Sequence, residues 1–196
     1  MSNSFLNAPT PRRNHYLLMR HGHSQANERG LIVSTPRLGL TSFGLSPRGE
    51  AQLEALVADW RWPEPTRILH SDFQRTTETA AWVAKRFGLS LQAEPRLRER
   101  VFGEFEGQPD EHYARVWALD AHSPEHREHA VESVASVAAR MQEVIASLES
   151  ERRGETILLV SHGDPLQILL TALGGRPLSQ HRDQPPLPPA SITPLT

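Results

Sequence analysis

Residues 16–27 read YLLMRHGHSQAN, a short apolar run that stops abruptly at polar side chains. The apolar part, residues 16–19, is long enough for a buried strand but short for a helix. In an open parallel sheet, the residues just past a strand's carboxyl end face the ligand crevice. Arg20, a forked donor that stays charged, and His21, a nucleophile near neutral pH, therefore form a candidate phosphate or oxyanion site.

Three small residues follow this pair. Gly22 would let the backbone come close to a ligand or take a turn that a side chain forbids. Ser24 and Asn27 add short hydrogen-bonding side chains where a helix could begin. Taken alone, Arg-His-Gly at residues 20–22 is equally consistent with a polar loop after a strand, so its meaning depends on the rest of the chain.

Two later stretches repeat the pattern of a polar side chain after a predicted strand. Residues 67–71 are predicted as a strand, and Arg75 then opens a predicted helix, where free amides and the helix dipole favour an anion. Residues 156–160 form the most apolar run and predict a central strand, which His162 follows. The alternatives are a surface salt bridge for Arg75 and a plain loop histidine for His162.

A fifth residue, Glu99, completes an ordered set. Together, Arg20 with His21, Arg75, Glu99 and His162 resemble the histidine phosphatase superfamily (phosphoglycerate mutase-like), and its small phosphatase branch in particular. The resemblance extends from about Tyr16 to the C-terminal region. It implies a three-layer α/β/α sandwich with a mostly parallel central sheet and an active site at the carboxyl ends of the strands.

The resemblance also implies roles for these residues. His21 would be the nucleophile that forms a phosphohistidine, Glu99 would donate a proton to the leaving oxygen, and His162 would complete the catalytic set. The implied phosphate-binding residues are Arg20, Arg75, His162, Asn27 and Ser24. No metal and no other cofactor are implied, because the arginines supply the positive charge that the phosphate needs.

Three carboxylates in residues 97–107 compete for the acid role: Glu99, Glu104 and Glu106. The family pattern places the proton donor on the first glutamate of this loop, which is Glu99 here. Glu106 lies in the Glu-Gly that follows, where we expect a structural hydrogen-bonding role.

Composition narrows the class of protein. The chain has 196 residues, no cysteine and a formal net charge of −2. This length suits one domain, and we expect a loose tail over residues 1–13, a catalytic domain over residues 14–196 and a small cap around residues 100–130. The near-neutral charge predicts no nucleic-acid or membrane partner. We expect no signal peptide and a cytoplasmic location, since the absence of cysteine fits a reducing compartment.

Local signals predict further elements. Residues 28–44 carry several glycines and a proline without a clean period, and are interpreted as a surface loop. Ser46 suits the N-cap of a helix that begins at the following proline. Asp164 and Pro165 are predicted to cap and start another helix. Residues 191–193 could add an edge strand.

Histidine clusters raise a metal hypothesis. His122, His126 and His129 have helical spacing, and His21 with His23 forms a His-x-His. The first set lies in a solvated charged run without a carboxylate that can be placed beside it, and His21 has a better-supported role. We therefore predict no metal site.

The function predicted from this pattern is hydrolysis of phosphomonoesters. Phosphoglycerate-mutase-type phosphoryl transfer is the first alternative, but only residues 108–131 separate the acid loop from the next predicted helix, and they contain no lysine. A non-catalytic phosphate-binding or phosphoprotein-binding module would not need Glu99. A nucleotide-binding protein would need a glycine-rich or lysine loop after the first strand, and neither is present. The predicted partner is a phosphorylated small molecule, with a phosphoprotein as a variant; the oligomeric state stays open.

Overall fold

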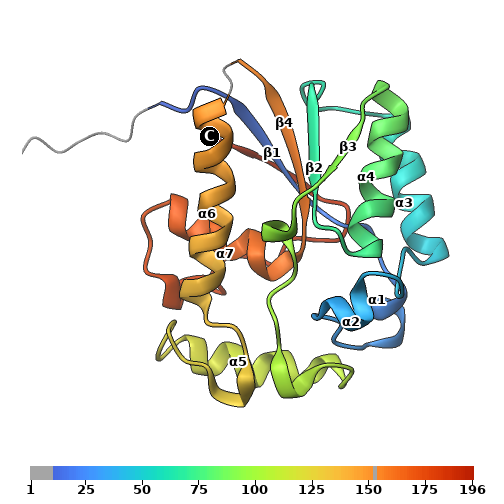
Figure 1. Ribbon diagram of the computed structural model, residues 1–196. Coiled ribbons are helices and arrows are strands. Elements are labelled where there is room, and N and C mark those ends of the chain that lie inside the picture. Colours follow the sequence, from blue (N-terminus) through green and yellow to red (C-terminus); the bar gives the residue numbers. More distant parts are fainter. Residues whose placement is uncertain (1–10, 152–153) are drawn as a thin grey trace, which may run out of the picture.

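The computed structural model describes residues 11–151 and 154–196, so residues 1–10 of the predicted tail lie outside the described residues. Its centre is a five-stranded sheet of order β3-β2-β4-β1-β5 (Figure 1). The strands are β1 His15–Arg20, β2 Arg67–His70, β3 Leu91–Ala93, β4 Thr156–Ser161 and β5 Ile192–Leu195. Strands β1 to β4 pair in parallel, whereas β5 pairs antiparallel with β1 at the edge.

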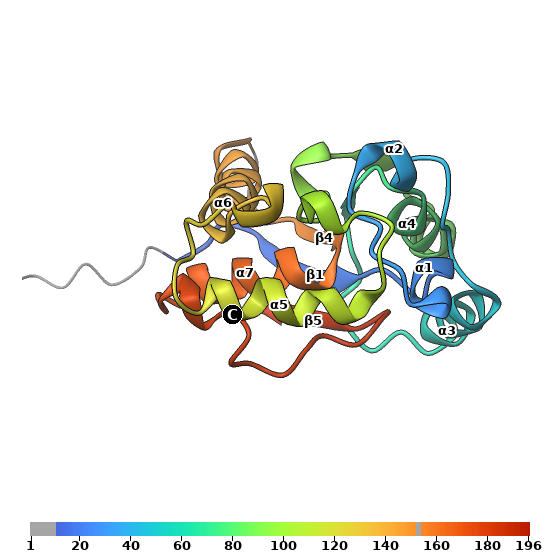
Figure 2. The ribbon, with the colours of Figure 1, turned by 90° about the horizontal axis from the view of Figure 1, so that it is seen from below.

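Helices cover both faces of this sheet. The α-helices of the described ranges are α1 Gln25–Arg29, α2 Pro36–Gly39, α3 Pro47–Ala58, α4 Gln74–Phe87, α5 Tyr113–Asp120, α6 Val134–Glu151 and α7 Gly163–Leu173. Helices α3 and α4 lie on one face, and α6 and α7 lie on the other (Figures 1 and 2). Because side chains alternate along a strand, Leu17 and Met19 join the core under α3 and α4, while Tyr16 and Leu18 join the core under α6 and α7. The predicted three-layer α/β/α architecture is confirmed.

The cap, residues 100–130, crosses the carboxyl ends of the parallel strands, where α5 lies below the sheet in Figure 1. It contains α5 and the short 3-10 helices η2 Gly103–Phe105, η3 Asp110–His112 and η4 Glu128–Ala130; η1 Pro95–Leu97 precedes it and η5 Leu178–Gln180 follows α7. A separate apolar cluster supports it, formed by Ile32, Phe102, Phe105, Val116 and Val131. The cap therefore closes over the edge of the sheet at which the site residues end.

Several local predictions can be compared with this fold. Ser46 caps α3 by accepting a hydrogen bond from the Gly49 amide, as predicted. The predicted edge strand is present as β5. The interpretation of residues 28–44 as a plain loop was wrong, because α2 forms within it behind a proline at its first position. No helix in the described ranges is both long and apolar enough to traverse a bilayer.

The prediction that Asp164 caps its helix was also wrong. His162 is the N-cap residue of α7, and Asp164 lies in the first turn. The Asp164 carboxylate is buried and bonds instead to the side chains of Arg100 and His181. A tertiary ion pair has therefore taken the carboxylate that the local Asp-Pro signal assigned to the helix end.

Candidate active site

Three strand ends and the start of the cap bring the predicted residues together. Arg20 ends β1, His21 follows it, and Arg75 is the second residue of α4. His162 follows β4, and Glu99 lies between η1 and the cap. Arg20, His21, Arg75 and Glu99 line one cavity of about 350 Å³. His162 packs behind it, with its ring centroid 5.3 Å from that of His21. We call Arg20, His21, Arg75 and His162 the cradle.

The His21 ring is held in one tautomer. Its Nδ1 atom lies 2.7 Å from the Gly22 carbonyl oxygen, which can only accept a hydrogen bond, so Nδ1 carries the proton. Its Nε2 atom accepts from Nε of Arg75 at 3.3 Å and is therefore the unprotonated nitrogen. Burial, and then the charges of Arg75 and Arg20, hold the pKa of His21 well below its usual range. The ring is consequently a neutral nucleophile at neutral pH.

The His162 ring lies beside that of His21. Its Nε2 atom lies 2.9 Å from Oγ of Ser71, and its ring is fully buried. Burial, and then the charge of Arg75, lower the pKa of His162 well below the usual value, so the ring is neutral. The Ser71 hydroxyl can donate to Nε2 or accept from it, and where it donates, the proton of His162 resides on Nδ1. That buried Nδ1 has no hydrogen-bond partner in the described part of the protein.

The two arginines of the cradle show the same incomplete pairing. Arg20 donates from Nη1 to the Leu187 carbonyl oxygen, and Arg75 donates from Nη2 to that of Val33. Among the described residues, nothing accepts a hydrogen bond from the buried Nε of Arg20 or the buried Nη1 of Arg75. Buried polar groups are nearly always paired in folded proteins. Unpaired buried nitrogen atoms on Arg20, Arg75 and His162, the three side chains that form the cradle with His21, therefore mark a place for an anion.

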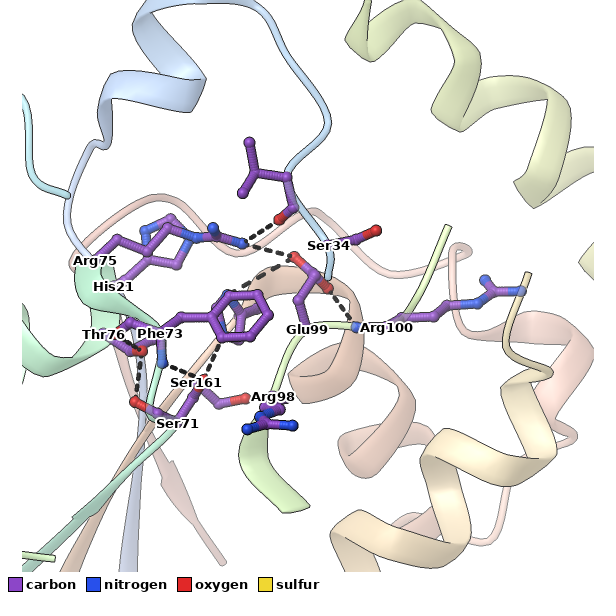
Figure 3. A network of polar contacts seen from close by, with 12 residues as sticks. His21, Ser34, Ser71, Phe73, Arg75, Thr76, Arg98, Glu99, Arg100 and Ser161 are labelled. Atoms are coloured by element: carbon purple, nitrogen blue, oxygen red, sulfur yellow. Dashed lines mark hydrogen bonds and ion pairs between the residues drawn. The ribbon is translucent and has the colours of Figure 1, made fainter. Parts of the chain in front are cut away.

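Glu99 lies at the edge of the cradle. One of its carboxylate oxygens, Oε2, is 3.7 Å from Nη2 of Arg75 and 3.8 Å from Nδ1 of His162, and the other accepts from the Arg100 amide at 2.9 Å (Figure 3). Burial raises the pKa of Glu99 to about 7, against the opposing charge of Arg75. At neutral pH this carboxyl group is thus divided between its acid and base forms, which suits proton transfer in both directions.

Ser24 and Asn27 are occupied more locally. Both line the cavity. The Ser24 hydroxyl accepts from the Asn27 amide at 3.1 Å, and the Asn27 carbonyl oxygen accepts in turn from the Ser24 amide at 3.0 Å. This capping box begins α1 and fixes the loop after β1. The phosphate-binding role predicted for Ser24 and Asn27 stays a prediction.

The other two candidate carboxylates lie outside the cavity. Both oxygens of Glu106 accept hydrogen bonds from the amides and hydroxyls of Ser34 and Thr35, which fixes the segment before α2 to the cap. Glu104 lies 3.2 Å from Nδ1 of His129 at the surface. Of the three glutamates, Glu99 is the one that faces the cradle.

A second buried cluster lies on the other side of Glu99. Arg100 is fully buried and donates to both oxygens of Asp120 at 2.7 and 2.8 Å, and to Asp164 at 3.3 Å. His181 bonds to the second Asp164 oxygen at 3.1 Å. We call Arg100, Asp120, Asp164 and His181 the paired cluster. It joins the cap helix α5 to α7 and the C-terminal segment, and the motif pattern gave no signal for it.

Three further residues of the cavity wall were missed by the sequence analysis. Tyr113 and Trp117 come from α5, and Arg182 comes from the C-terminal segment. Burial, and then the charge of Glu99, raise the pKa of Tyr113 above its usual range, so its hydroxyl keeps its proton. Their helical spacing on α5 could have suggested that Tyr113 and Trp117 share a face, but nothing local shows that this face points at the cradle.

Gly22 lies at a closely packed point of the loop after β1. A Cβ atom at this position would lie 2.4 Å from Cδ2 of Leu53, which is far inside van der Waals contact. The glycine therefore allows this loop to pack against α3, and the predicted close approach of its backbone to a ligand stays a prediction.

The predicted histidine clusters are accounted for by other contacts. His126 bonds to Asp120 at 2.7 Å, and His23 bonds to the Ser46 hydroxyl at 2.6 Å. In the described ranges of the chain, no group of three or more metal-binding side chains is placed to hold an ion.

Comparison with known proteins identifies the family. The model of the histidine phosphatase superfamily (branch 1) matches residues 16–196. The chain belongs to this superfamily. The match includes every residue of the cradle, together with Glu99, and a phosphohistidine mechanism is general to the family.

Members of the superfamily with several names resemble the chain. A protein of Photorhabdus laumondii named "Probable phosphoglycerate mutase GpmB" is 32% identical over 171 residues, which cover 84% of this chain and 77% of that protein. Mycobacterial glucosyl-3-phosphoglycerate phosphatase, in complex with VO3, has a TM-score of 0.80 at 26% identity, with 95% and 93% of the two chains covered. A structure titled "Mycobacterial hydrolase 1" has a TM-score of 0.76 at 25% identity, with 92% and 90% covered. Phosphatases and mutases of the histidine phosphatase superfamily therefore share this fold.

Proposed function

We propose that this protein is a metal-independent phosphomonoester hydrolase that acts through a phosphohistidine on His21. One observation carries the proposal: the unprotonated Nε2 of His21 lies in a cradle whose other three members each hold a buried nitrogen atom without an acceptor among the described residues, namely Nε of Arg20, Nη1 of Arg75 and Nδ1 of His162. A phosphoryl group needs such donors on its equatorial oxygens and a nucleophile in line with the leaving oxygen.

The first half-reaction transfers the phosphoryl group to the enzyme. Nε2 of His21 attacks phosphorus while the bond to the ester oxygen breaks, and protonated Glu99 supplies the proton that makes the leaving group an alcohol. The Gly22 carbonyl keeps the proton on Nδ1, so the ring attacks in the right tautomer and its developing positive charge is stabilised by that hydrogen bond.

The second half-reaction restores the enzyme. A water molecule attacks the phosphohistidine, Glu99, now a carboxylate, takes its proton, and phosphate leaves with His21 neutral again. The raised pKa of about 7 for Glu99 serves both steps, because the same group must hold a proton in one and accept it in the next. Arg20 and Arg75 offset the charge of the phosphate throughout, which is the support for proposing that no metal is needed.

The mutase alternative is favoured by the printed name of the Photorhabdus relative. A mutase must retain a bisphosphate while it turns over. The cap offers no lysine for this purpose, since the one lysine of the chain is Lys85, far from this segment in the sequence. We therefore propose hydrolysis, with a phosphorylated small molecule or a phosphoprotein as substrate and the cytoplasm as location.

The test is hydrolysis of p-nitrophenyl phosphate by the wild type and His21→Ala, with EDTA present, from acid to mildly alkaline pH. We expect activity that survives EDTA, declines above about pH 7 as Glu99 loses its proton, and is absent in His21→Ala. Activity abolished by EDTA and restored by a divalent metal, or retained in His21→Ala, would refute the mechanism. Absence of wild-type activity at every pH would favour the non-catalytic binding module.

A further inference from the structure

Beyond the cradle, the cavity continues between the cap and the C-terminal part of the chain. Its wall there includes Tyr113 and Trp117 of α5, Asp110 at the start of η3, Gln167 of α7 and Arg182. We call these residues the outer subsite. Since a phosphoryl group bound in the cradle must carry its leaving group somewhere in the same cavity, the outer subsite is the surface which that group contacts.

The outer subsite has an aromatic wall. The rings of Tyr113 and Trp117 are stacked, with centroids 5.3 Å apart and an interplanar angle of 10°. Phe102 packs edge-on against Tyr113 at 4.8 Å and holds it in place. The indole Nε1 of Trp117 is buried and has no acceptor within the described ranges. Aromatic side chains in the cavity wall, together with an unused donor, suit a ring-shaped ligand that carries oxygen atoms.

The charges in the outer subsite disfavour acidic leaving groups. Arg182 is the one cation among the described residues that line it. Its guanidinium lies 3.5 Å from the Asp164 carboxylate, donates to Gln167 and sits 3.6 Å above the centre of the Trp117 ring. Asp110 adds a carboxylate to the wall. A second anion would therefore meet one cation that is already paired and one extra negative charge.

We propose that the outer subsite selects phosphomonoesters whose leaving group is an uncharged ring bearing hydroxyl groups, such as a sugar, and disfavours leaving groups that carry a carboxylate or a second phosphate. This inference rests on the proposed hydrolase function. The ring packs against the parts of the Tyr113 and Trp117 side chains that line the cavity, Nε1 of Trp117 donates to a ring oxygen or hydroxyl, and Asp110 accepts from a hydroxyl.

Three substrates separate ring shape from charge. Glucose 6-phosphate has an uncharged ring as its leaving group, and glycerol 3-phosphate has an uncharged acyclic one. The leaving group of 3-phosphoglycerate is also acyclic but carries a carboxylate. We expect kcat/KM to fall in that order, by about tenfold at each step. Equal values for glycerol 3-phosphate and 3-phosphoglycerate, or a preference for 3-phosphoglycerate, would overturn the charge argument. Equal values for the sugar and glycerol esters would overturn the ring argument.

Variants assign the preference to residues. Trp117→Ala should reduce kcat/KM for glucose 6-phosphate about tenfold more than for glycerol 3-phosphate. Trp117→Phe keeps a ring but removes the indole N–H, so its preference for glucose 6-phosphate over glycerol 3-phosphate should fall by less than that of Trp117→Ala. This variant also provides the test if Trp117→Ala does not fold. Asp110→Asn should raise kcat/KM for 3-phosphoglycerate relative to that for glycerol 3-phosphate. Unchanged ratios in all three variants would contradict the assignment.

A binding measurement keeps this inference separate from the proposed function. Calorimetric titration of the three esters into His21→Ala gives an affinity order without turnover. If the wild type fails to hydrolyse any ester, the proposed function falls, while the affinity order still tests the outer subsite. If the wild type hydrolyses all three with equal kcat/KM and His21→Ala binds them equally, the proposed function stands and the outer subsite has no selectivity.

Discussion

Glu99 and Arg100 are adjacent in the chain, yet they face two buried polar clusters of opposite kind. Glu99 borders the cradle, where three buried donors have no acceptor in the described part of the protein. The Arg100 side chain points away from the cradle (Figure 3). In the paired cluster, both oxygens of Asp120 and one of Asp164 accept its hydrogen bonds. One cluster is complete without a ligand, and the other is not.

The contrast separates stabilisation from function. An unpaired buried donor costs stability, so an excess of such donors at one place is a cost that a ligand must recover. A bidentate arginine–carboxylate pair that is fully buried holds two elements in register. Here the Arg100–Asp120 pair joins the start of the cap to α5, and the further bond from Arg100 to Asp164 joins both to α7. These bonds also hold Arg100, whose backbone amide bonds to Glu99. The paired cluster thus positions Glu99, the residue that we propose as the proton donor.

The largest expected difference is between one histidine from each cluster. His21→Ala should lower kcat for p-nitrophenyl phosphate by about 10⁴-fold or more, because it removes the nucleophile. His181→Ala should instead lower the melting temperature, since His181 bonds to Asp164 in the paired cluster. Thermal unfolding and steady-state kinetics on both variants check this. Comparable loss of kcat in the two variants at a temperature where both are folded would break the comparison.

The two buried arginines should differ in the same way. Arg75→Ala should lower kcat/KM by about 10²- to 10³-fold, without loss of stability, because its burial is poorly compensated. Arg100→Ala should lower the free energy of unfolding by about 3–5 kcal/mol, since it removes the guanidinium that pairs with the buried carboxylates of Asp120 and Asp164. Chemical denaturation measures the second effect.

The double replacement Arg100→Met with Asp120→Leu is the matched control for this pair. It should recover much of the lost stability, because no buried charge is left alone. If Arg75→Ala proved as destabilising as Arg100→Ala, the cradle would be a structural cluster rather than a ligand site.

Glu99 should lower stability as it ionises. Its pKa is raised from 4.5 to about 7 in the folded protein, so between these values the folded state binds more protons than the unfolded state. The free energy of unfolding therefore falls as pH rises through this window. Glu99→Gln cannot ionise, and it should gain up to about 3 kcal/mol relative to the wild type between pH 5 and pH 8.

The quantity to measure is the difference in the free energy of unfolding between the wild type and Glu99→Gln. His21 and His162 have lowered pKa values in both, so their opposite contribution, which raises stability with pH, cancels. Denaturation at several pH values gives the result. A difference that does not change with pH would contradict the buried, raised pKa of Glu99.

The smallest expected effect concerns Glu106, a carboxylate that lies outside the cavity. Glu106→Gln should cost about 1–2 kcal/mol, because Glu106 accepts hydrogen bonds from Ser34 and Thr35 at the foot of the cap. Glu99→Gln should have the larger effect on kcat. Assays of the two variants side by side check this; equal loss of kcat would reopen the assignment of the acid among the glutamates.

The sequence was sufficient for the cradle and for the layers of the fold. His21, Arg75 and His162 each follow a strand or open a helix at a position that local pattern predicts, and their order in the chain carries the family resemblance. The edge strand β5 and the cap of α3 by Ser46 also followed from local chemistry.

The rest depended on tertiary placement. The paired cluster joins residues that are 20 and 64 positions apart from Arg100 in sequence, and it drew Asp164 away from the helix-capping role that Asp-Pro suggested. Trp117 and Arg182 belong to separate segments that meet only when the cap crosses the sheet. Periodicity shows which residues share a face of a helix, but it does not show what that face meets.

Trapping the covalent intermediate tests the central claim most directly. The wild type is mixed with p-nitrophenyl phosphate, denatured within milliseconds at alkaline pH and digested, and the peptide that contains His21 is examined by mass spectrometry, with His21→Ala as the matched control. The account predicts a phosphoryl group on His21 that is stable to alkali and lost in acid, in step with a burst of p-nitrophenol. Release of product without any phosphorylated His21, or phosphorylation of another residue, would contradict it.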